Sequence, residues 1–347
     1  MRNKRNDVRY IILRKLKDNA ASYISGQSLS ESLGITRTAV WKHIKALMNE
    51  GYVIESSTRK GHRLVAAADN LNAYELEHGP GAGCIGKKIY LFESIDSTNN
   101  YAKKAALEGC DDGTVVIAEA QTSGRGRLGR AWDSAYKKGI WMSVVLKPSI
   151  DIRNAQVVSL AASVAVVNAI MDATGIQACI KWPNDIIIDG KKACGILTEM
   201  GMEMDCLNYI VLGIGMNVNQ DVTDFPPHLR GVATSLKMFA EGCALKPDFP
   251  GTAKVFDRTR LVKSLLFELE KIYDKINKGF TREIICEWKR HSVTLGREVK
   301  FILKDVEYMG IASNVTDDGR LVVKCNDGVE RELSSGEVQV RGMLGYI

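Results

Sequence analysis

The segment Gln121–Trp132 combines residue types suited to holding an anion, because three arginines alternate there with three glycines. Glycine carries no Cβ, so its backbone can approach a ligand closely. Arginine guanidinium groups donate paired hydrogen bonds to phosphate or carboxylate oxygens. The segment is therefore predicted to bind an anionic ligand, and a flexible basic surface loop is the alternative that its local pattern leaves open.

The same segment places Gly124, Gly126 and Gly129 at the G-x-G-x-x-G spacing of dinucleotide-binding folds. Such a fold needs a helix that begins at the last glycine and points its N-terminus at the pyrophosphate. No helical pattern begins at Gly129, and the residues from Trp132 to Tyr136 lead toward another strand. We therefore exclude this kind of dinucleotide site.

Two further segments combine glycine with lysine or with an apolar strand. Lys181–Asp185 is followed by Lys192 and Gly195, which would place a cation and an accessible backbone at the mouth of a hairpin. Taken alone, this pattern is mostly that of a turn. Gly213–Asn219 has two glycines inside an apolar strand, which indicates a ligand or a backbone packed tightly against it.

Strands and irregular helices must hold these motifs in place. Ser97 and Thr98 precede a predicted helix over Thr98–Gly109, and their hydroxyls are suited to capping it or to contacting a ligand. The predicted strands are Ile89–Ile95, Thr114–Gln121, Ile140–Lys147, Ile180–Asp189, Lys192–Met200 and Tyr209–Val218. The predicted longer helices are Ala155–Ala173, which is almost wholly apolar and must be buried, and Thr259–Asn277, which is amphipathic. This order predicts an α+β sheet domain rather than a regular βαβ array.

The positive charge of the chain is concentrated near its N-terminus. Residues 1–65 hold 13 Lys and Arg against 5 Asp and Glu, a net charge of +8, whereas the whole chain carries +6. The predicted elements there are helices near 7–18, from Gln27 to Gly34 and from Thr36 to Glu50, then β-rich runs at Tyr52–Ser56 and His62–Val65. This order predicts a winged helix-turn-helix.

A basic winged helix is suited to DNA, because its third helix enters the major groove with its N-terminal half. Arginine and threonine address base edges there, while lysine contacts phosphates. The predicted DNA-binding residues are Thr36, Arg37, Thr38, Trp41 and Lys42 on the helix, with Arg59 and Lys60 at the tip of the wing. The alternative is a winged-helix interaction domain that binds no DNA.

The rest of the chain limits the compartment and the C-terminal fold. None of the 8 cysteines forms a C-x-x-C pair or lies close to a histidine cluster, which argues against a disulfide framework or zinc site and favours buried free thiols in a reducing compartment. No apolar run is expected to reach membrane-spanning length, so a cytoplasmic protein without a membrane partner is predicted.

Short strands at Val299–Leu303, Met309–Val315, Leu321–Cys325 and Glu330–Leu333 predict a small all-β barrel.

Together these motifs resemble one family closely, the biotin–protein ligases that are also biotin operon repressors. The resemblance covers nearly the whole chain, and Gly34–Ile44 looks like the DNA-reading segment of that family. The ligase motifs follow in order as Ser97–Asn99, Gln121, Gly124–Arg127, Lys181–Asp185, Lys192 and Gly213–Asn217. Leu128 and the stretch Leu236–Thr259 are less typical. The domains implied are a winged helix at 1–66, a linker at 67–86, a mixed α/β ligase domain at 87–292 and an SH3-like barrel at 293–347.

The resemblance also implies roles for individual residues. Those that would hold the biotin ring system are Ser97, Thr98, Asn99 and Gln121. Those that would fold over biotin and its adenylate belong to the loop Gly124, Arg125, Gly126 and Arg127. Lys192 would contact the biotin carboxylate and the phosphate, and it joins Arg125 and Arg127 as the predicted catalytic residues. The adenylate would lie beside Trp132, Gly195, Gly215 and Asn217.

The reaction implied by the resemblance has two steps and needs ATP and Mg²⁺. Biotin and ATP give biotinyl-5'-AMP, and the biotinyl group then passes to a lysine of the biotin carboxyl carrier protein of acetyl-CoA carboxylase or a related carboxylase. The adenylate would also act as corepressor. Ordering of Gly124–Arg130 on the ligand would favour a homodimer that binds a two-fold related operator at genes for biotin synthesis or uptake.

Three other functions remain open from the sequence alone. One is a repressor whose ligase-like domain only senses biotin, although intact Arg125, Arg127 and Lys192 argue against it. Another is a ligase for a different acid, such as lipoate, on a related fold. The last is a ligase whose N-terminal domain does not bind DNA.

Overall fold

The computed structural model describes residues 8–19, 22–66, 71–72, 76, 83–203, 206–243, 255–304, 306–334 and 340–342. The chain forms two compact units, Met1–His78 and Gly79–Ile347. Most of the predicted linker 67–86 lies outside the described residues. The finer domain limits given above therefore stay predictions.

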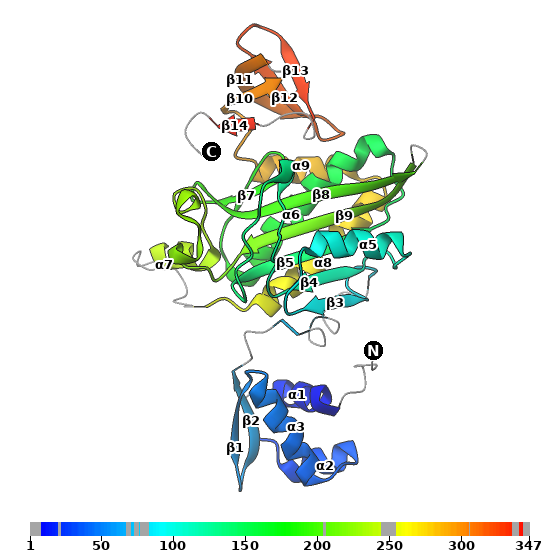
Figure 1. The fold of residues 1–347 in the computed structure, drawn as a ribbon, viewed down its shortest axis with the longest axis vertical. Coiled ribbons are helices and arrows are strands. Elements are labelled where there is room, and N and C mark those ends of the chain that lie inside the picture. The colour runs from blue at the N-terminus through cyan, green and yellow to red at the C-terminus, as the bar shows by residue number, and fades with distance from the viewer. Residues whose placement is uncertain are drawn as a thin grey trace. The chain divides into compact units, whose positions relative to one another are not determined.

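The N-terminal unit has the predicted winged helix-turn-helix (Figure 1). Its elements are α1 (Val8–Asp18), α2 (Gly26–Leu33), α3 (Arg37–Asn49), β1 (Val53–Ser57) and β2 (Gly61–Ala66). Gly34 ends α2 in the left-handed conformation, with φ of 63°, which a residue without Cβ adopts at little cost. Thr36 caps α3, because its hydroxyl accepts a hydrogen bond from the Ala39 N–H at 3.2 Å.

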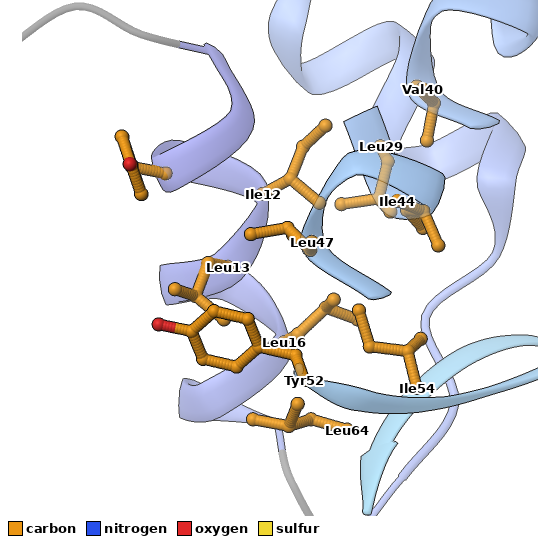
Figure 2. Close-up of a cluster of buried hydrophobic side chains, with 11 residues drawn as sticks. Ile12, Leu13, Leu16, Leu29, Val40, Ile44, Leu47, Tyr52, Ile54 and Leu64 are labelled. Atoms are coloured by element: carbon orange, nitrogen blue, oxygen red, sulfur yellow. The ribbon is translucent and has the colours of Figure 1, made fainter. Parts of the chain in front are cut away.

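One hydrophobic core holds these helices and the wing together. Figure 2 shows the side chains of α1, α2 and α3 meeting those of the strands. Its labelled members are Ile12, Leu13, Leu16, Leu29, Val40, Ile44, Leu47, Tyr52, Ile54 and Leu64. Burial of each large aliphatic side chain contributes about 1.5–3 kcal/mol, so this small unit depends on a few residues.

We predict that Ile44→Ala destabilises the N-terminal unit by about 2–5 kcal/mol, because Ile44 is fully buried and its loss leaves a cavity. Hydrogen–deuterium exchange measures the effect locally, through faster exchange of the α1 and α3 amides. Lys45→Ala is the control, since Lys45 lies next to it on the same helix but is exposed. Equal loss of protection in the Gly79–Ile347 unit would show that the two units do not unfold separately.

The second unit is built on a seven-stranded sheet in the order β3-β4-β5-β9-β8-β7-β6 (Figure 1). The strands are β3 (Ile89–Phe92), β4 (Val115–Ala118), β5 (Gly139–Leu146), β6 (Cys179–Lys181), β7 (Asp185–Ile188), β8 (Lys191–Glu203) and β9 (Cys206–Asn217). β3 and β4 are parallel, and the other neighbours are antiparallel. This is the mixed α/β domain expected at the centre of the chain.

Helices cover both faces of this sheet. The described helices of this unit are α5 (Thr98–Leu107), α6 (Ala155–Thr174), α7 (Leu236–Cys243), α8 (Arg258–Asn277) and α9 (Thr281–His291), and α5, α6 and α8 pack on the sheet. All eight residues of β5 are buried, which requires a layer on each side of a strand whose side chains alternate. α5 packs against β4, β5 and β9, whereas α8 contacts β5 and α6, and α6 contacts β6, β7 and β8.

Contrary to expectation, one segment reaches membrane-spanning length. α6 has 20 residues and is apolar enough to cross a membrane, with a mean hydropathy of 1.7 over its best window. In this protein 72% of that window is buried inside the fold. The expected buried helix is therefore confirmed, and its composition follows from contact with the sheet and with α8 and α9.

Two further predictions need correction. The predicted single strand Ile180–Asp189 is split into β6 and β7, which pair with each other, because Pro183 lies in the turn between them and has no N–H for a ladder. The thiols in the described part of the chain are free, but only Cys194 and Cys325 are buried. α7 and α9 were not predicted.

The C-terminal strands form a five-stranded antiparallel sheet in the order β13-β12-β11-β10-β14. They are β10 (Glu298–Leu303), β11 (Val306–Val315), β12 (Leu321–Cys325), β13 (Glu330–Leu333) and β14 (Val340–Gly342). Within the described residues β13 and β14 are edges, so closure into a barrel stays a prediction. The buried Trp182 ties this sheet to the larger one, because its indole N–H donates to the Gly319 carbonyl at 3.3 Å.

Candidate functional site

The arginine–glycine segment folds back on itself beside the larger sheet. The Trp132 N–H donates to the Gly124 carbonyl at 2.9 Å, and the Gly126 N–H donates to the Arg130 carbonyl at 2.7 Å. Between these bonds lies a single 3₁₀ turn, Arg127–Gly129, in which Leu128 has φ of 58°. No α-helix begins at Gly129, which confirms that the segment is not a dinucleotide-binding turn.

This segment closes over a cavity of about 440 Å³ in the second unit. Twelve of the predicted ligand-binding residues line it: Ser97, Thr98, Asn99, Gln121, Arg125, Gly126, Arg127, Trp132, Lys192, Gly195, Gly215 and Asn217. Gly124 lies just behind the lining, where a Cβ would come within 2.4 Å of the Trp132 carbonyl oxygen. Residues spread over more than one hundred positions therefore meet at one site.

One wall of the cavity is neutral and rich in hydrogen bonds. The side-chain oxygen Oε1 of Gln121 accepts from the Thr98 N–H at 2.8 Å and lies 3.0 Å from the Thr98 hydroxyl. Ser143, which was not predicted, has its hydroxyl within hydrogen-bond distance of Thr98 and Asn99. Ser97 occupies the capping position of α5 but makes no capping hydrogen bond, so capping does not explain its place in the lining.

A second part of the lining carries cations. Lys192 Nζ lies 2.5 Å from Asp185 Oδ1 and 5.3 Å from the centre of the Trp132 ring. Arg127 is partly buried and donates to Asn184 Oδ1 at 3.0 Å. Burial lowers the pKa of Arg127, although the nearby Asp185 opposes this shift. Arg125 is exposed at the rim, so the two predicted catalytic arginines differ in environment.

The floor between these walls is bare backbone. Gly195 on β8 and Gly215 on β9 are paired in register, and the Trp132 indole lies against both. A Cβ at Gly215 would come within 2.5 Å of Trp132 Nε1, and one at Gly195 within 2.9 Å of the same ring. The sequence signal of glycine inside an apolar strand thus corresponds to a side chain packed on the sheet.

The N-terminal unit presents the predicted DNA-binding residues on its surface. Arg37, Thr38, Trp41 and Lys42 are exposed along the first half of α3, and Arg59 and Lys60 are exposed at the turn between β1 and β2. Thr36 is also exposed, but its hydroxyl caps the helix. Trp41 is 40% exposed and stacks on His62 of the wing, with ring centres 5.8 Å apart. The helix and the wing therefore form one continuous face.

Comparisons with known proteins agree with this arrangement. The chain matches the Biotin/lipoate A/B protein ligase family over residues 91–217, an HTH domain over 9–63 and the Biotin protein ligase C terminal domain over 294–341. It is 37% identical over 332 residues to the bifunctional ligase/repressor BirA of Bacillus subtilis, covering 95% of this chain and 98% of that protein. The chain belongs to the bifunctional biotin ligase/repressor family.

Two more distant relatives support the same family. The bifunctional ligase/repressor BirA of Escherichia coli is 27% identical over 91% of this chain and 92% of its own length. A solved biotin protein ligase from Aquifex aeolicus, in complex with biotin and ATP, aligns with a TM-score of 0.61 and 28% identity. That match covers 74% of this chain and 99% of the other chain.

In this ligase/repressor, a closing segment that was not predicted also lines the cavity. Phe225, Leu229, Val232 and Ala233 line it, and they come from a stretch with no regular period. The backbone of Lys192 makes two hydrogen bonds with this stretch. The Lys192 N–H donates to the Val232 carbonyl, and the Lys192 carbonyl accepts from the Thr234 N–H, each at 2.9 Å. The segment therefore fixes the backbone that carries the lysine.

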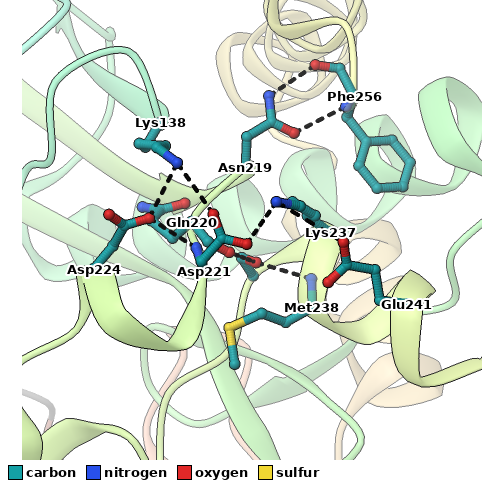
Figure 3. A network of polar contacts seen from close by, with 10 residues as sticks. Lys138, Asn219, Gln220, Asp221, Asp224, Lys237, Met238, Glu241 and Phe256 are labelled. Carbon is teal, nitrogen blue, oxygen red and sulfur yellow. Dashed lines mark hydrogen bonds and ion pairs between the residues drawn. The ribbon is translucent and has the colours of Figure 1, made fainter. Parts of the chain in front are cut away.

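A network of polar contacts pins the closing segment at its two ends (Figure 3). Asp221 lies between Lys138, at 3.2 Å, and Lys237 of α7, at 2.5 Å. The Asn219 side chain bonds both backbone groups of Phe256, at 2.8 and 3.0 Å. Hydrogen bonds from Lys237 and Lys138 hold the pKa of Asp221 below its usual value, so these contacts persist at neutral pH.

We predict that Gly215→Ala in this ligase/repressor displaces the Trp132 indole, because a methyl group has no room beside it. Overpacking of this kind costs about 1–3 kcal/mol, measured as a lower free energy of unfolding, and changes the tryptophan fluorescence. Gly231→Ala is the control, since nothing lies within 4 Å of its Cβ position. Identical spectra and stabilities for the two variants would contradict the packing described here.

Proposed function

We propose that this chain is an ATP-dependent biotin–protein ligase that also acts as a biotin-responsive transcriptional repressor of genes for biotin synthesis or uptake. The observation that carries the proposal is that neutral hydrogen-bonding side chains and cationic side chains line the same cavity. A neutral polar wall suits the ureido head of biotin. A cationic wall suits the place where its carboxylate meets the phosphates of ATP.

The site residues follow from this division of the cavity. Ser97, Thr98, Asn99 and Gln121 hold the biotin ring system, while Gly124, Arg125, Gly126 and Arg127 fold over the adenylate. Trp132, Gly195 and Gly215 provide a flat surface for the adenine. Asn217 shapes the wall indirectly, because its amide already donates to the Thr234 carbonyl and accepts from Gln220.

The first step joins two anions. A carboxylate oxygen of biotin forms a bond to the α-phosphorus of ATP, and the bond from that phosphorus to the oxygen bridging to the β-phosphate breaks, releasing pyrophosphate. Lys192, Arg127 and Arg125 lower the repulsion between the reactants and stabilise charge on the transferring phosphoryl group. Asp185 holds Lys192 in the site before the ligand binds.

The second step transfers the biotinyl group to a carrier. A neutral lysine amine of a biotin carboxyl carrier protein attacks the biotinyl carbonyl carbon. The bond from that carbon to the bridging oxygen breaks, AMP leaves with the bridging oxygen, and the amine gives up a proton. Asp185 could receive that proton only after its ion pair with Lys192 breaks. This requires the Lys192 ammonium group to turn toward the phosphate. In the structure Asp185 braces Lys192, which is its first role.

Magnesium fits this site only as an ion that arrives with the nucleotide. Within the described residues, no group of three His, Cys, Asp or Glu side chains could hold a metal. Mg²⁺ is commonly held by substrate phosphates, waters and one or two carboxylates, and Asp133 is an exposed carboxylate in the lining. When bound there, the ion would neutralise part of the charge of the phosphates.

We predict that Lys192→Ala lowers the rate of carrier biotinylation by about 100-fold or more, because it removes a cation aimed at the reacting charge. The assay combines the protein, ATP, biotin and a carrier domain, and it measures covalent biotin on the carrier. Lys191→Ala is a matched control on the neighbouring, exposed residue. Full activity of the Lys192 variant would overturn the site assignment.

The repressor function uses the N-terminal unit. Arg37 and Thr38 address base edges of operator DNA, while Lys42, Arg59 and Lys60 contact phosphates. Biotinyl-5'-AMP is the corepressor, and ordering of Gly124–Arg130 on it favours a homodimer that spans two half-sites. The C-terminal sheet, closed as an SH3-like barrel, completes a cytoplasmic protein that meets the carrier and DNA in turn.

We predict that operator binding falls steeply as salt rises, because phosphate contacts release counterions. Electrophoretic mobility shifts measured with and without biotin and ATP report both the salt slope and the dependence on ligand. Lys42→Ala weakens binding to all sequences, whereas Arg37→Ala also relaxes the choice of sequence by about 1–3 kcal/mol. Binding that is insensitive to biotin and ATP would separate the repressor from the ligand site.

A further inference from the structure

Glu199 belongs to none of the sequence motifs, yet it lies directly behind the neutral wall of the cavity. It stands on β8, and its two carboxylate oxygens accept from Asn99 Nδ2 at 2.8 Å and from Lys103 Nζ at 2.9 Å. Burial opposes charge at this place, but the hydrogen bonds from Lys103 and Asn99 hold the pKa of Glu199 below its usual value. The carboxylate is therefore ionised at neutral pH and can only accept hydrogen bonds.

An acceptor at Glu199 fixes the direction of the neighbouring hydrogen bonds. The Asn99 NH₂ group faces the carboxylate, so its carbonyl oxygen faces the Ser143 hydroxyl, 2.6 Å away. Ser143 has one proton, which it donates to that carbonyl oxygen. The Ser143 oxygen then serves as an acceptor for the Thr98 hydroxyl, and the two oxygens are 2.8 Å apart.

The other neighbour of Thr98 is an acceptor as well. The Gln121 side chain donates from Nε2 to Ser134 at 2.8 Å, which turns its carbonyl oxygen toward Thr98. Thr98 therefore donates its hydroxyl proton to the protein, at either neighbour, and leaves a lone pair for the cavity that it lines. A ligand head group that completes this wall must bring a donor.

We propose that Glu199, through Asn99, Ser143 and Thr98, makes this end of the cavity select a head group that carries N–H donors. The inference rests on the proposed function and deepens it. The ureido ring of biotin carries N–H groups, whereas the dithiolane ring of lipoate, the other acid named for the matched family, carries none. Glu199 touches no substrate and is a positioning residue.

The test compares two acids in the full-length protein. Glu199→Gln offers Asn99 either an oxygen or an NH₂ group, so the direction of the hydrogen bonds from Asn99 through Ser143 to Thr98 is no longer fixed. The KM for biotin is expected to rise about 10-fold, which corresponds to the loss of one hydrogen bond in the site. The KM for ATP and kcat stay within about 2-fold, and adenylation of lipoate is unchanged, so discrimination between the acids falls.

A second variant and a control separate this role from a general loss of structure. Ser143→Ala interrupts the same series of hydrogen bonds between Asn99 and Thr98. It is also expected to raise the KM for biotin. Glu203→Gln removes a carboxylate from the same strand, where it is exposed and accepts only from Asn208 among the contacts described, and it leaves both acids unaffected. Thermal unfolding is measured for all three variants.

The outcomes distinguish the inference from the function on which it rests. Wild-type protein that does not adenylate biotin overturns the proposed function and the inference with it. If the wild type is active, a Glu199→Gln variant that behaves like Glu203→Gln overturns the inference alone. So does a variant that loses biotin, lipoate and ATP equally, because that pattern marks a structural role.

Discussion

The glycines Gly195, Gly213 and Gly215 on the paired strands β8 and β9 are the constraint on which the site depends. Asn99 and Trp132 occupy the space where Cβ atoms of Gly213, Gly195 and Gly215 would otherwise lie. Asn99 and Trp132 belong to different walls, so the same group of glycines determines the position of a side chain in each wall. Neighbouring groups contact these two side chains: Ser143 and Glu199 bond to Asn99, and Lys192 lies beside the indole.

The two walls handle charge in opposite ways. At the cationic wall, Lys192 pairs with Asp185, and Arg127 donates to the neutral Asn184 while the charge of Asp185 also acts on it. At the neutral wall, Glu199 pairs with Lys103 and is also stabilised by the charge of Arg125 in the lining, while its hydrogen bond from Asn99 orients that side chain. A carboxylic acid with a polar neutral head is complementary to both ends at once.

Local patterns in the sequence were enough to place the helices of the winged domain, most strands and the glycine–arginine loop. Capping by Thr36 and the left-handed Gly34 are properties of a few adjacent residues, and such properties can be read from a sequence. Glu199 and Ser143 could not be found in this way, because their importance comes from strand register that brings them next to Asn99. The closing segment around Phe225–Ala233 escaped for a related reason, since its contacts with Lys192 join residues about forty positions apart and leave no period in the chain.

The contact between Trp182 and the Gly319 carbonyl has a consequence for how the molecule can be divided. Trp182 shares a five-residue segment with Asn184 and Asp185, which hold Arg127 and Lys192. Its backbone N–H also bonds to the Thr294 hydroxyl at 2.9 Å, so both polar hydrogens of this buried residue depend on the C-terminal part of the chain. A protein shortened before Val293 would lose these acceptors beside its reaction centre, so the last strands are a structural wall of the enzyme rather than a detachable appendage.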